Sequence, residues 1–389
     1  MNAFKKAILS IFLGNLTVSM GTIIFSLFIA NQISPEKFGE FSYLMVFATI
    51  LAVIIKCGLD NSLIYFHLDG GNKFNLISFG FIFCAGALSL LVLFALEVGD
   101  AIKIVMMAVL FAYKDITFAI YRCRNKTLTY YIHYILIISL LQFIFVFFGL
   151  LEPFDTQIVC FSIFIIILFP NLLDKTNRVF DGDFIKYGLF SMFAAISGIL
   201  LNKIDVLMIR AAGSFEDVAL YQLSAQISNL LAFVLGTFNL VFAPIIVKLY
   251  KQGDLSGLSK LYIKSTRILT AITLLLMILI IFFKTQILYY FNPVYVHAAT
   301  TLTILCLAQF AVVLFGSVGY LLTMAGYPQK QLIRLIFAMI LNVVLNLFLI
   351  PIYGIEGAAI ATLFTLCVNS LLGYIFVKKI LPIKLFIVV

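Results

Sequence analysis

The chain of 389 residues is 63% hydrophobic and 11% charged, whereas an average soluble domain is about 45–50% apolar and about 25% charged. With a mean hydropathy of +1.16, much of its apolar surface must face lipid, which excludes an ordinary soluble protein. Membrane topology and attraction to anionic lipid headgroups account for the net charge of +9, so this charge does not predict a nucleic-acid partner.

Twelve segments are apolar enough to cross a membrane as helices, each of which needs about 20 mostly apolar residues. In chain order the spans are expected at residues 8–30, 38–59, 75–97, 101–121, 129–151, 156–172, 184–212, 217–247, 262–283, 298–325, 331–351 and 356–378. The first begins like a signal peptide, but its apolar run continues without a small-residue cleavage site, so we interpret it as a retained helix. The sequence therefore predicts an all-α integral membrane protein with short loops.

Basic residues are concentrated on alternate loops. One set of loops and ends carries 20 of the 26 Lys and Arg residues. The opposite set carries Lys37, Lys103, Arg210 and Lys284. Because loops rich in Lys and Arg stay cytoplasmic, and twelve spans place both ends on the same side, we expect both termini in the cytoplasm.

A short internal repeat supports a division of the chain into halves. A shift of 180 residues aligns SPEKFGEF, which begins at Ser34, with SFEDVALY, which begins at Ser214. Each stretch joins the first span of a six-helix half to the second. Two six-helix bundles of the same orientation are a transporter architecture, with the substrate path between them. The expected lobes are residues 1–180 and 181–389.

Several motifs in the chain are similar to those of one transporter family. They are SPEKFGEFSYL, NKIDVLMI, YLLTMAGYPQKQLI and LIPIYGIEGAAIAT. Together they resemble the polysaccharide-exporter and O-antigen (Wzx-type) flippases of the multidrug/oligosaccharidyl-lipid/polysaccharide (MOP) superfamily, most strongly over residues 184–378. The resemblance implies a MATE-like fold of two six-helix bundles, a bacterial inner-membrane location, no enzymatic activity and no cofactor.

The last of these motifs has a structural interpretation. Pro351 lacks an amide donor and is expected to end the eleventh span, and Gly354 allows a tight reversal. Gly357 and the alanines after it give the twelfth span a smooth face for close helix packing. We therefore interpret this motif as structural and place no binding site there.

Charged residues inside the spans are the candidates for a functional site, because each costs at least about 2.5–3.5 kcal/mol at the bilayer centre. The candidate substrate-binding residues are Lys203, Lys114, Arg122, Lys56 and Asn202. Lys114 and Arg122 fall on one helical face, in a stripe with Phe118 and Tyr121. Snorkelling to the interface and buried structural pairs such as Lys114–Asp115 remain alternative interpretations of these charges.

Asp205 is a candidate for ion coupling, because a desolvated carboxylate titrates nearer neutrality. Its spacing from Lys203 places the two side chains on different faces of the helix. A structural role as the partner of a lysine is an equally good interpretation. No metal or ATP site is predicted, because the three histidines are scattered and there is no Walker A motif.

The resemblance implies a substrate, an undecaprenyl-diphosphate-linked oligosaccharide moved from the cytoplasmic to the periplasmic leaflet by alternating access. Its diphosphate suits lysine and arginine, which form charge-assisted hydrogen bonds. The implied partners are membrane lipids and the glycosyltransferases and polymerase of the same pathway. The alternatives are a MATE-like small-molecule exporter, which should have an acidic cavity, a membrane enzyme such as an O-antigen polymerase, which should have a large outer loop, and a membrane scaffold.

Overall fold

The computed structural model describes residues 2–67, 75–95, 100–124, 126–168 and 182–381, and within these ranges every regular element is a helix. The all-α prediction is confirmed. The first nine elements are α1 (Asn2–Gln32), α2 (Pro35–Lys56), α3 (Leu59–His67), α4 (Asn75–Ala95), α5 (Ala101–Cys123), α6 (Thr127–His133), the π-helix η1 (Tyr134–Leu140), α7 (Leu141–Phe147) and α8 (Pro153–Leu168). The remainder are α9 (Gly182–Ala212), α10 (Phe215–Lys251), α11 (Leu255–Phe282), α12 (Lys284–Phe291), the 3₁₀ helix η3 (Pro293–Ala298), α13 (Ala299–Leu314), α14 (Val318–Met324) and α15 (Pro328–Ile380).

Eight helices in the described ranges are long and apolar enough to cross a membrane. Three shorter apolar helices lie at Leu16–Gln32, Gly80–Phe94 and Pro153–Leu168. The long helix α15 contains a break at Gly354, where φ is 57° and ψ is −133°, so its two halves correspond to two of the predicted spans. Large hydrophobic side chains such as Phe83 and Phe348, each 68% exposed, point outward as expected for lipid-facing helices.

The described chain forms two compact units. The N-terminal unit comprises Met1–Ile29 and Phe41–Ile199, and the C-terminal unit comprises Ala30–Glu40 and Leu200–Val389. The predicted lobe boundary at residues 180 and 181 lies outside the described residues, so that boundary stays a prediction.

The helix α5 is the centre of the N-terminal unit, where it packs against α3, α4, α6 and α8. Ala108, Ala112 and Ile116 are completely buried at a spacing of four residues, which gives α5 a continuous packing face. On the neighbouring helices, Tyr130 and Phe164 pack edge to face with ring centroids 5.5 Å apart. Small residues on α5 therefore let the surrounding helices approach it closely.

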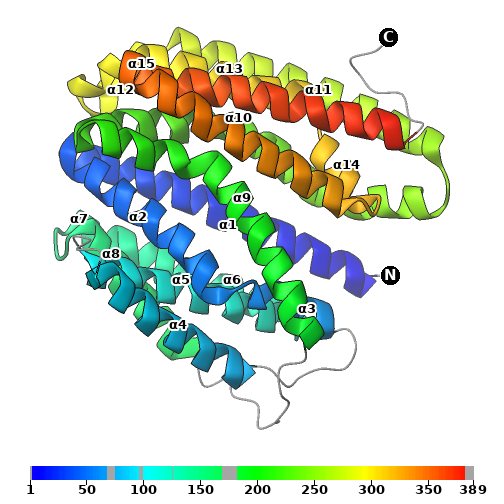
Figure 1. The fold of residues 1–389 in the computed structure, drawn as a ribbon, viewed down its shortest axis with the longest axis horizontal. Coiled ribbons are helices and arrows are strands. Elements are labelled where there is room, and N and C mark those ends of the chain that lie inside the picture. The colour runs from blue at the N-terminus through cyan, green and yellow to red at the C-terminus, as the bar shows by residue number, and fades with distance from the viewer. Residues whose placement is uncertain (1, 68–74, 96–99, 125, 169–181, 382–389) are drawn as a thin grey trace. The chain divides into compact units, whose positions relative to one another are not determined.

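The helix α13 has the corresponding central place in the C-terminal unit. It contacts α10, α11 and α15, and Figure 1 shows these helices lying alongside one another. After the break at Gly354, the alanines Ala358, Ala359 and Ala361 are completely buried. A Cβ atom on Gly357 would collide with the backbone of Leu349. The expected reversal at Gly354 and the close packing after it are both present.

The two repeated segments that begin at Ser34 and Ser214 lie together in the C-terminal unit. The Ser34 hydroxyl accepts a hydrogen bond from the Lys37 amide at the start of α2. Ser214 forms a full capping box with Asp217 at the start of α10. A Cβ atom on Gly39 would collide with the carbonyl of Phe215 and approach the amide of Ala219, which is the residue equivalent to Gly39 under the 180-residue shift. The equivalent positions of the repeat therefore pack against each other.

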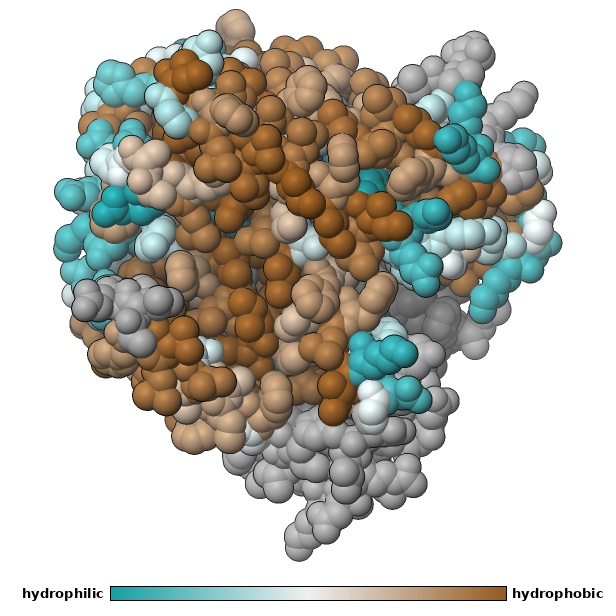
Figure 2. Space-filling view, viewed as in Figure 1, coloured by the Kyte–Doolittle hydropathy of each residue, from teal (hydrophilic) through white to brown (hydrophobic). Residues whose placement is uncertain are grey.

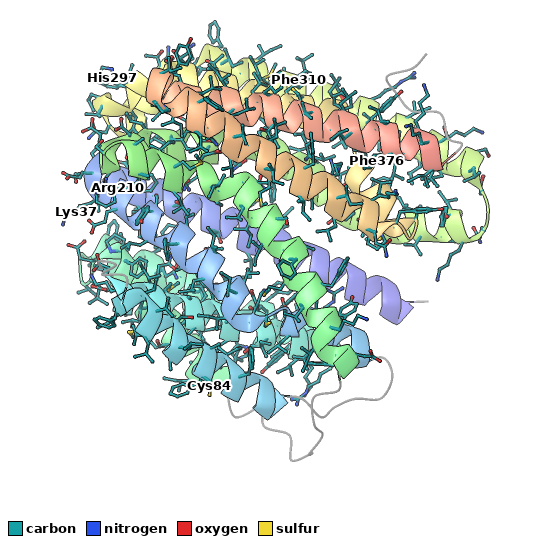
Figure 3. All side chains as sticks on the ribbon, in the orientation of Figure 1. Lys37, Cys84, Arg210, His297, Phe310 and Phe376 are labelled. Carbon is teal, nitrogen blue, oxygen red and sulfur yellow. The ribbon has the colours of Figure 1, made fainter. Side chains whose placement is uncertain are left out.

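Polar and apolar residues are segregated on the surface. Figure 2 shows hydrophobic residues over most of the coloured surface in that view, with hydrophilic residues gathered toward its margins. In the C-terminal unit, Figure 3 places Lys37, Arg210 and His297 near one end and Phe376 toward the other. Lys37 and Arg210 were predicted on the same side of the membrane, and their common end agrees with that assignment. Which side is cytoplasmic stays a prediction.

Candidate functional site

Four charged side chains form a cluster where α2, α3 and α5 meet in the N-terminal unit. The Lys56 Nζ atom lies 2.8 Å from Asp60 Oδ2 and 2.6 Å from Asp115 Oδ2. The Lys114 Nζ atom lies 3.3 Å from Asp115 Oδ1. Two lysines and two aspartates cancel in formal charge, so the cluster as a whole is neutral. Lys56 is 7% exposed and is held between two carboxylates.

The turn between α2 and α3 brings this cluster together. Cys57 and Gly58 both have positive φ, 50° and 69°, so the helix is interrupted immediately after Lys56, and Asp60, four residues later, pairs with it. At Gly58 a side chain is also excluded by space, because a Cβ atom would collide with the Gly188 carbonyl. A left-handed conformation costs a non-glycine residue such as Cys57 about 1–2 kcal/mol, and the packing around the buried ion pairs must offset that cost.

A cavity of 410 Å³ lies within the N-terminal unit, between α1, α2, α5, η1, α7 and α8. Lys114 is the charged residue among the described residues that line it, and its Nζ atom lies 5.1 Å from the Phe111 ring centroid. The polar lining residues are Ser19, Thr22, Tyr134, Ser139, Gln142 and Gln157. The π-helix η1 contributes Tyr134 and Ser139 to this wall, in agreement with the frequent occurrence of π-helical turns at functional sites.

The remaining part of the predicted stripe on α5 leads away from this cavity. Phe118 packs against Tyr130, with ring centroids 5.1 Å apart, and Tyr121 is 4% exposed beside the same tyrosine. Arg122, in the last turn of α5, is exposed. The structure therefore brings Lys114 to the cavity and leaves Arg122 at the end of the helix. Lys56 is absent from the described cavity lining.

Asp205 is enclosed by neutral hydrogen-bond donors in the C-terminal unit. Its side chain accepts hydrogen bonds from the Tyr221 hydroxyl (2.6 Å), the Thr362 hydroxyl (2.8 Å) and the Asn346 amide (2.6 Å). The residue is 2% exposed. Among the described residues it forms no ion pair with a Lys or Arg side chain. These partners lie on α10 and α15, so three helices converge on one carboxylate.

The other candidate residues of α9 have different surroundings. Lys203 is partly buried and forms no ion pair with any described residue. Asn202 is exposed and contributes to the wall of a cavity in the C-terminal unit. Arg210 donates a hydrogen bond to the Gly213 carbonyl and stacks over the Phe215 ring, which places it at the end of the helix.

The cavity that Asn202 lines has a volume of 470 Å³ and is bounded by α9, α10, α13, α14 and α15. Its described lining contains one charged residue, Arg334, which is one of the 20 basic residues assigned from the sequence to the predicted cytoplasmic loops and ends. A helical signal was present: Gln331, Arg334, Asn342 and Asn346 recur on one face of the eleventh span. Of these, Arg334, Asn342 and Asn346 are buried in the structure. A buried polar stripe on a predicted span is thus the pattern that would have located the cavity.

Comparison with known proteins identifies the class of fold. Among solved structures, the chain is similar to a multidrug-resistance MATE family transporter of the MOP superfamily in an inward-facing conformation, with a TM-score of 0.75 and 14% identity over 94% of both chains. It is also similar to the lipid II flippase MurJ in an inward closed conformation, with a TM-score of 0.73 and 13% identity over 93% of this chain and 87% of that one. The protein therefore has the fold of the MOP-superfamily transporters.

Sequence comparison agrees with this fold. The MatE family model matches residues 191–348. Two uncharacterized membrane proteins of Methanocaldococcus jannaschii are each 28% identical to this chain, over 55% and 54% of its length. The matched region spans 43% and 51% of those relatives. An uncharacterized membrane protein of Haemophilus influenzae is 21% identical over 58% of this chain and 61% of its own length. The protein is a multi-pass membrane protein with a transporter fold.

Proposed function

We propose that the protein is a flippase for polyprenyl-diphosphate-linked oligosaccharides in the bacterial inner membrane. It carries the undecaprenyl-linked repeat unit of an O-antigen, capsule or exopolysaccharide from the cytoplasmic to the periplasmic leaflet. Alternating access exposes the binding site to one leaflet and then to the other. The reaction requires no covalent chemistry and no cofactor.

The observation that carries this proposal is the chemistry of the two cavities. Each is lined by hydroxyl and amide groups with one cationic side chain, Lys114 in one unit and Arg334 in the other. No Asp or Glu belongs to the described lining of either cavity. Hydroxyls and amides pair with the hydroxyl groups of a sugar, and lysine and arginine pair with phosphate oxygens.

In this proposal Lys114 binds the diphosphate in the cavity of the N-terminal unit. Lys203, which lies deep in a predicted span, is the phosphate-binding candidate of the C-terminal unit. Lys114 exchanges part of its interaction with Asp115 for a phosphate oxygen, while Lys56 holds Asp115 in place. Asn202 contacts the sugar. Arg122, at the end of α5, attracts the anionic diphosphate headgroup of the lipid-linked substrate. The polyprenyl tail remains in lipid, where the exposed apolar helices meet it.

Asp205 is proposed to couple transport to an ion gradient. The Thr362 and Tyr221 hydroxyls both donate to its Oδ2 atom, and the Asn346 amide donates to its Oδ1 atom. The Asn346 Oδ1 atom is buried without a hydrogen-bond partner among the described residues. Such a group of oxygens suits a sodium ion or a proton on the carboxylate. Asp205→Asn preserves the shape of the side chain and should leave flipping insensitive to either gradient. A variant that responds to a sodium or proton gradient as the wild type does would make Asp205 structural.

The alternative is a MATE-like exporter of small molecules, and the fold comparisons do not discriminate between the two functions. A cationic drug requires carboxylates or exposed aromatic faces in its site. The described cavity linings contain aromatic rings such as Phe111 and Phe161, but they contain no carboxylate and the one charged side chain of each is a cation. The charge of the linings therefore favours an anionic substrate. The glycosyltransferases and the polymerase of the same pathway are the expected functional partners.

A reconstituted flipping assay tests the proposed function. Purified protein in proteoliposomes should expose a fluorescent polyprenyl-diphosphate oligosaccharide to an impermeant quencher. Lys114→Ala and Lys203→Ala should each reduce the initial rate by about tenfold or more, because each removes a charge-assisted contact. Lys103→Ala is the matched control, because its side chain is 47% exposed at the start of α5. Full activity in both the Lys114 and the Lys203 variants would contradict the proposed phosphate-binding residues.

A further inference from the structure

Arg334 is a buried cation held in place by neutral groups. Its Nε and Nη2 atoms donate hydrogen bonds to the Gln331 Oε1 atom at 3.2 and 2.9 Å. Its Nη1 atom donates to the Asn369 carbonyl at 2.9 Å. A guanidinium has five N–H groups, so these contacts leave one N–H on each terminal nitrogen uncommitted. The residue is 6% exposed, which makes its full charge costly without a counter-ion.

No counter-charge for this guanidinium is found in the described part of the chain. Arg334 forms no ion pair with a described Asp or Glu, and the cavity lining contains no carboxylate. Most buried charges in proteins are paired, because desolvation of an unpaired charge costs several kcal/mol. The N-terminal unit follows this rule, since Lys114 has Asp115 beside it.

The packing around Arg334 is built to accommodate it. A Cβ atom on Gly319 would lie 2.8 Å from the Arg334 Nη2 atom. A Cβ atom on Gly373 would lie 3.1 Å from its Nη1 atom. Glycines on α14 and α15 thus leave space for the guanidinium at the cavity wall. Close packing on two sides therefore fixes the position of the Arg334 guanidinium.

The same cavity is lined by a residue whose hydrogen-bond acceptor has no donor. Asn369 is 7% exposed, lines the cavity, and its Oδ1 atom has no hydrogen-bond partner among the described residues. Other lining side chains already have partners, since Gln309 donates to Asn229 outside the lining and Ser317 donates to Asn239 within it. A ligand that satisfies both Arg334 and Asn369 carries an oxyanion and a hydrogen-bond donor, a combination that an acidic sugar with its hydroxyl groups provides.

We propose that this cavity is a binding site for an acidic saccharide, a sugar that bears a carboxylate or phosphate group. Arg334 binds the oxyanion through its two uncommitted N–H groups, and Asn369 accepts a hydrogen bond from a sugar hydroxyl. The volume of 470 Å³ lies within the range of about 300–1,000 Å³ that is usual for small-molecule sites. The site does not depend on the lipid-linked substrate proposed above, because a free acidic sugar has the same chemistry.

Binding of glucuronate to the purified full-length protein tests the site, with glucose as the neutral probe. Saturation-transfer NMR on detergent-solubilised protein detects weak binding of both sugars. Wild-type protein should bind glucuronate, and Arg334→Gln should weaken it by about tenfold or more. Lys330→Gln is the matched control, because it removes one positive charge from an exposed position a turn earlier on the same helix and should leave binding within about twofold.

A second variant preserves the test if Arg334→Gln does not fold. Asn369→Asp has almost the same size and places a carboxylate in the wall of the cavity that Arg334 also lines, so it should abolish glucuronate binding while Arg334 stays buried. Equal binding of glucuronate and glucose by the wild type, or unchanged glucuronate binding in Asn369→Asp, would overturn the proposal.

An uptake assay distinguishes a free acidic sugar from an acidic sugar unit that belongs to a larger conjugate. Uptake of labelled glucuronate into proteoliposomes identifies a free sugar as the ligand. Binding without uptake identifies an acidic unit within a larger conjugate. Both results support the site, and neither depends on the flipping rates of the Lys114 and Lys203 variants, so failure of the two proposals can be distinguished.

Discussion

The two cavities differ in how their cationic residue is neutralised. In the N-terminal unit, Lys114 is paired with Asp115, which also pairs with Lys56. In the C-terminal unit, Arg334 is held by Gln331 and by the Asn369 carbonyl. The first cation has an internal counter-ion and the second does not. A ligand anion must therefore displace a carboxylate in one cavity, whereas it meets an unneutralised guanidinium in the other.

Among the substitutions considered, replacement of Lys56 should lower the stability of the folded protein most. Lys56→Met leaves Asp60 and Asp115 without the cation that joins them, and breaking a buried pair of this kind costs about 3–5 kcal/mol. The lower end of that range is expected, because the Asp115 side chain is 31% exposed. Thermal unfolding in detergent measures the loss, and Lys103→Met should change stability by less than about 1 kcal/mol. Equal melting temperatures for the two variants would show that the cluster is not a stabilising unit.

A larger side chain at Gly373, which packs against Arg334, should lower the stability of the protein by an intermediate amount. A Cβ atom on Gly373 would lie 2.8 Å from Val318 Cγ2 and 3.1 Å from Arg334 Nη1, so Gly373→Ala should destabilise the protein by about 1–3 kcal/mol through overpacking. Gly236→Ala is the control, because its Cβ would meet no atom within 4 Å and it gains helix propensity. If Gly373→Ala is as stable as Gly236→Ala, the glycine is not needed to accommodate the guanidinium.

Removal of Asp115, the counter-ion of Lys114, should leave the N-terminal cavity with an unpaired cation, as Arg334 is in the C-terminal cavity. Asp115→Asn leaves Lys56 paired with Asp60 and frees Lys114 to meet an anion. Binding of inorganic pyrophosphate, measured by isothermal titration calorimetry, should tighten by about fivefold or more, because a competing charge close to the lysine is lost. Weaker binding in this variant would mean that Asp115 positions Lys114 and does not compete with the ligand.

The smallest expected effect concerns an exposed helix cap outside both cavities. Asp254 accepts hydrogen bonds from the Gly257 amide and the Ser256 hydroxyl at the start of α11. These contacts, led by the Gly257 amide, lower the pKa of the Asp254 carboxyl. A lowered pKa in the folded state stabilises the cap above the pKa of the unfolded chain, and this stabilisation is lost as pH falls through the folded value.

Hydrogen exchange at residues 255–258 measures this cap directly. Exchange corrected for intrinsic rate should increase on acidification in the wild type. Asp254→Asn retains a capping side chain and should show much less dependence on pH. A wild-type cap with no pH dependence would contradict the proposed role of the carboxylate.

The positions of the helices were largely predictable from the sequence, because hydrophobic length alone defines a membrane span. The reversal at Gly354 was predictable for a local reason, since proline and glycine restrict or free the backbone where they stand. Local patterns did not predict the π-helix at residues 134–140 or the break between α13 and α14, where Gly316 has a φ of 66°. Both interruptions line a cavity, and their stability depends on packing between helices.

The cation sites were less predictable, because their neutralisation depends on contacts across the fold. Lys114 and Lys56 were both predicted to bind substrate, yet 59 residues separate Lys56 from the Asp115 that pairs with it. The polar stripe with Asn342 and Asn346 marks the helix face of Arg334, but the sequence does not show that this arginine is buried without a counter-ion. Its burial depends on Gly319 and Gly373, and the spacing of residues along one helix does not reveal such a contact.

Transport of two substrates of opposite charge in the same proteoliposomes tests whether the cavities select an anion. One is a fluorescent polyprenyl-diphosphate oligosaccharide, and the other is the cationic dye ethidium. If the cationic linings select an anion, the anionic lipid should cross the bilayer faster in proteoliposomes than in protein-free liposomes. The ethidium concentration inside the proteoliposomes should stay unchanged. Transport of ethidium without flipping of the lipid would instead make the protein a small-molecule exporter.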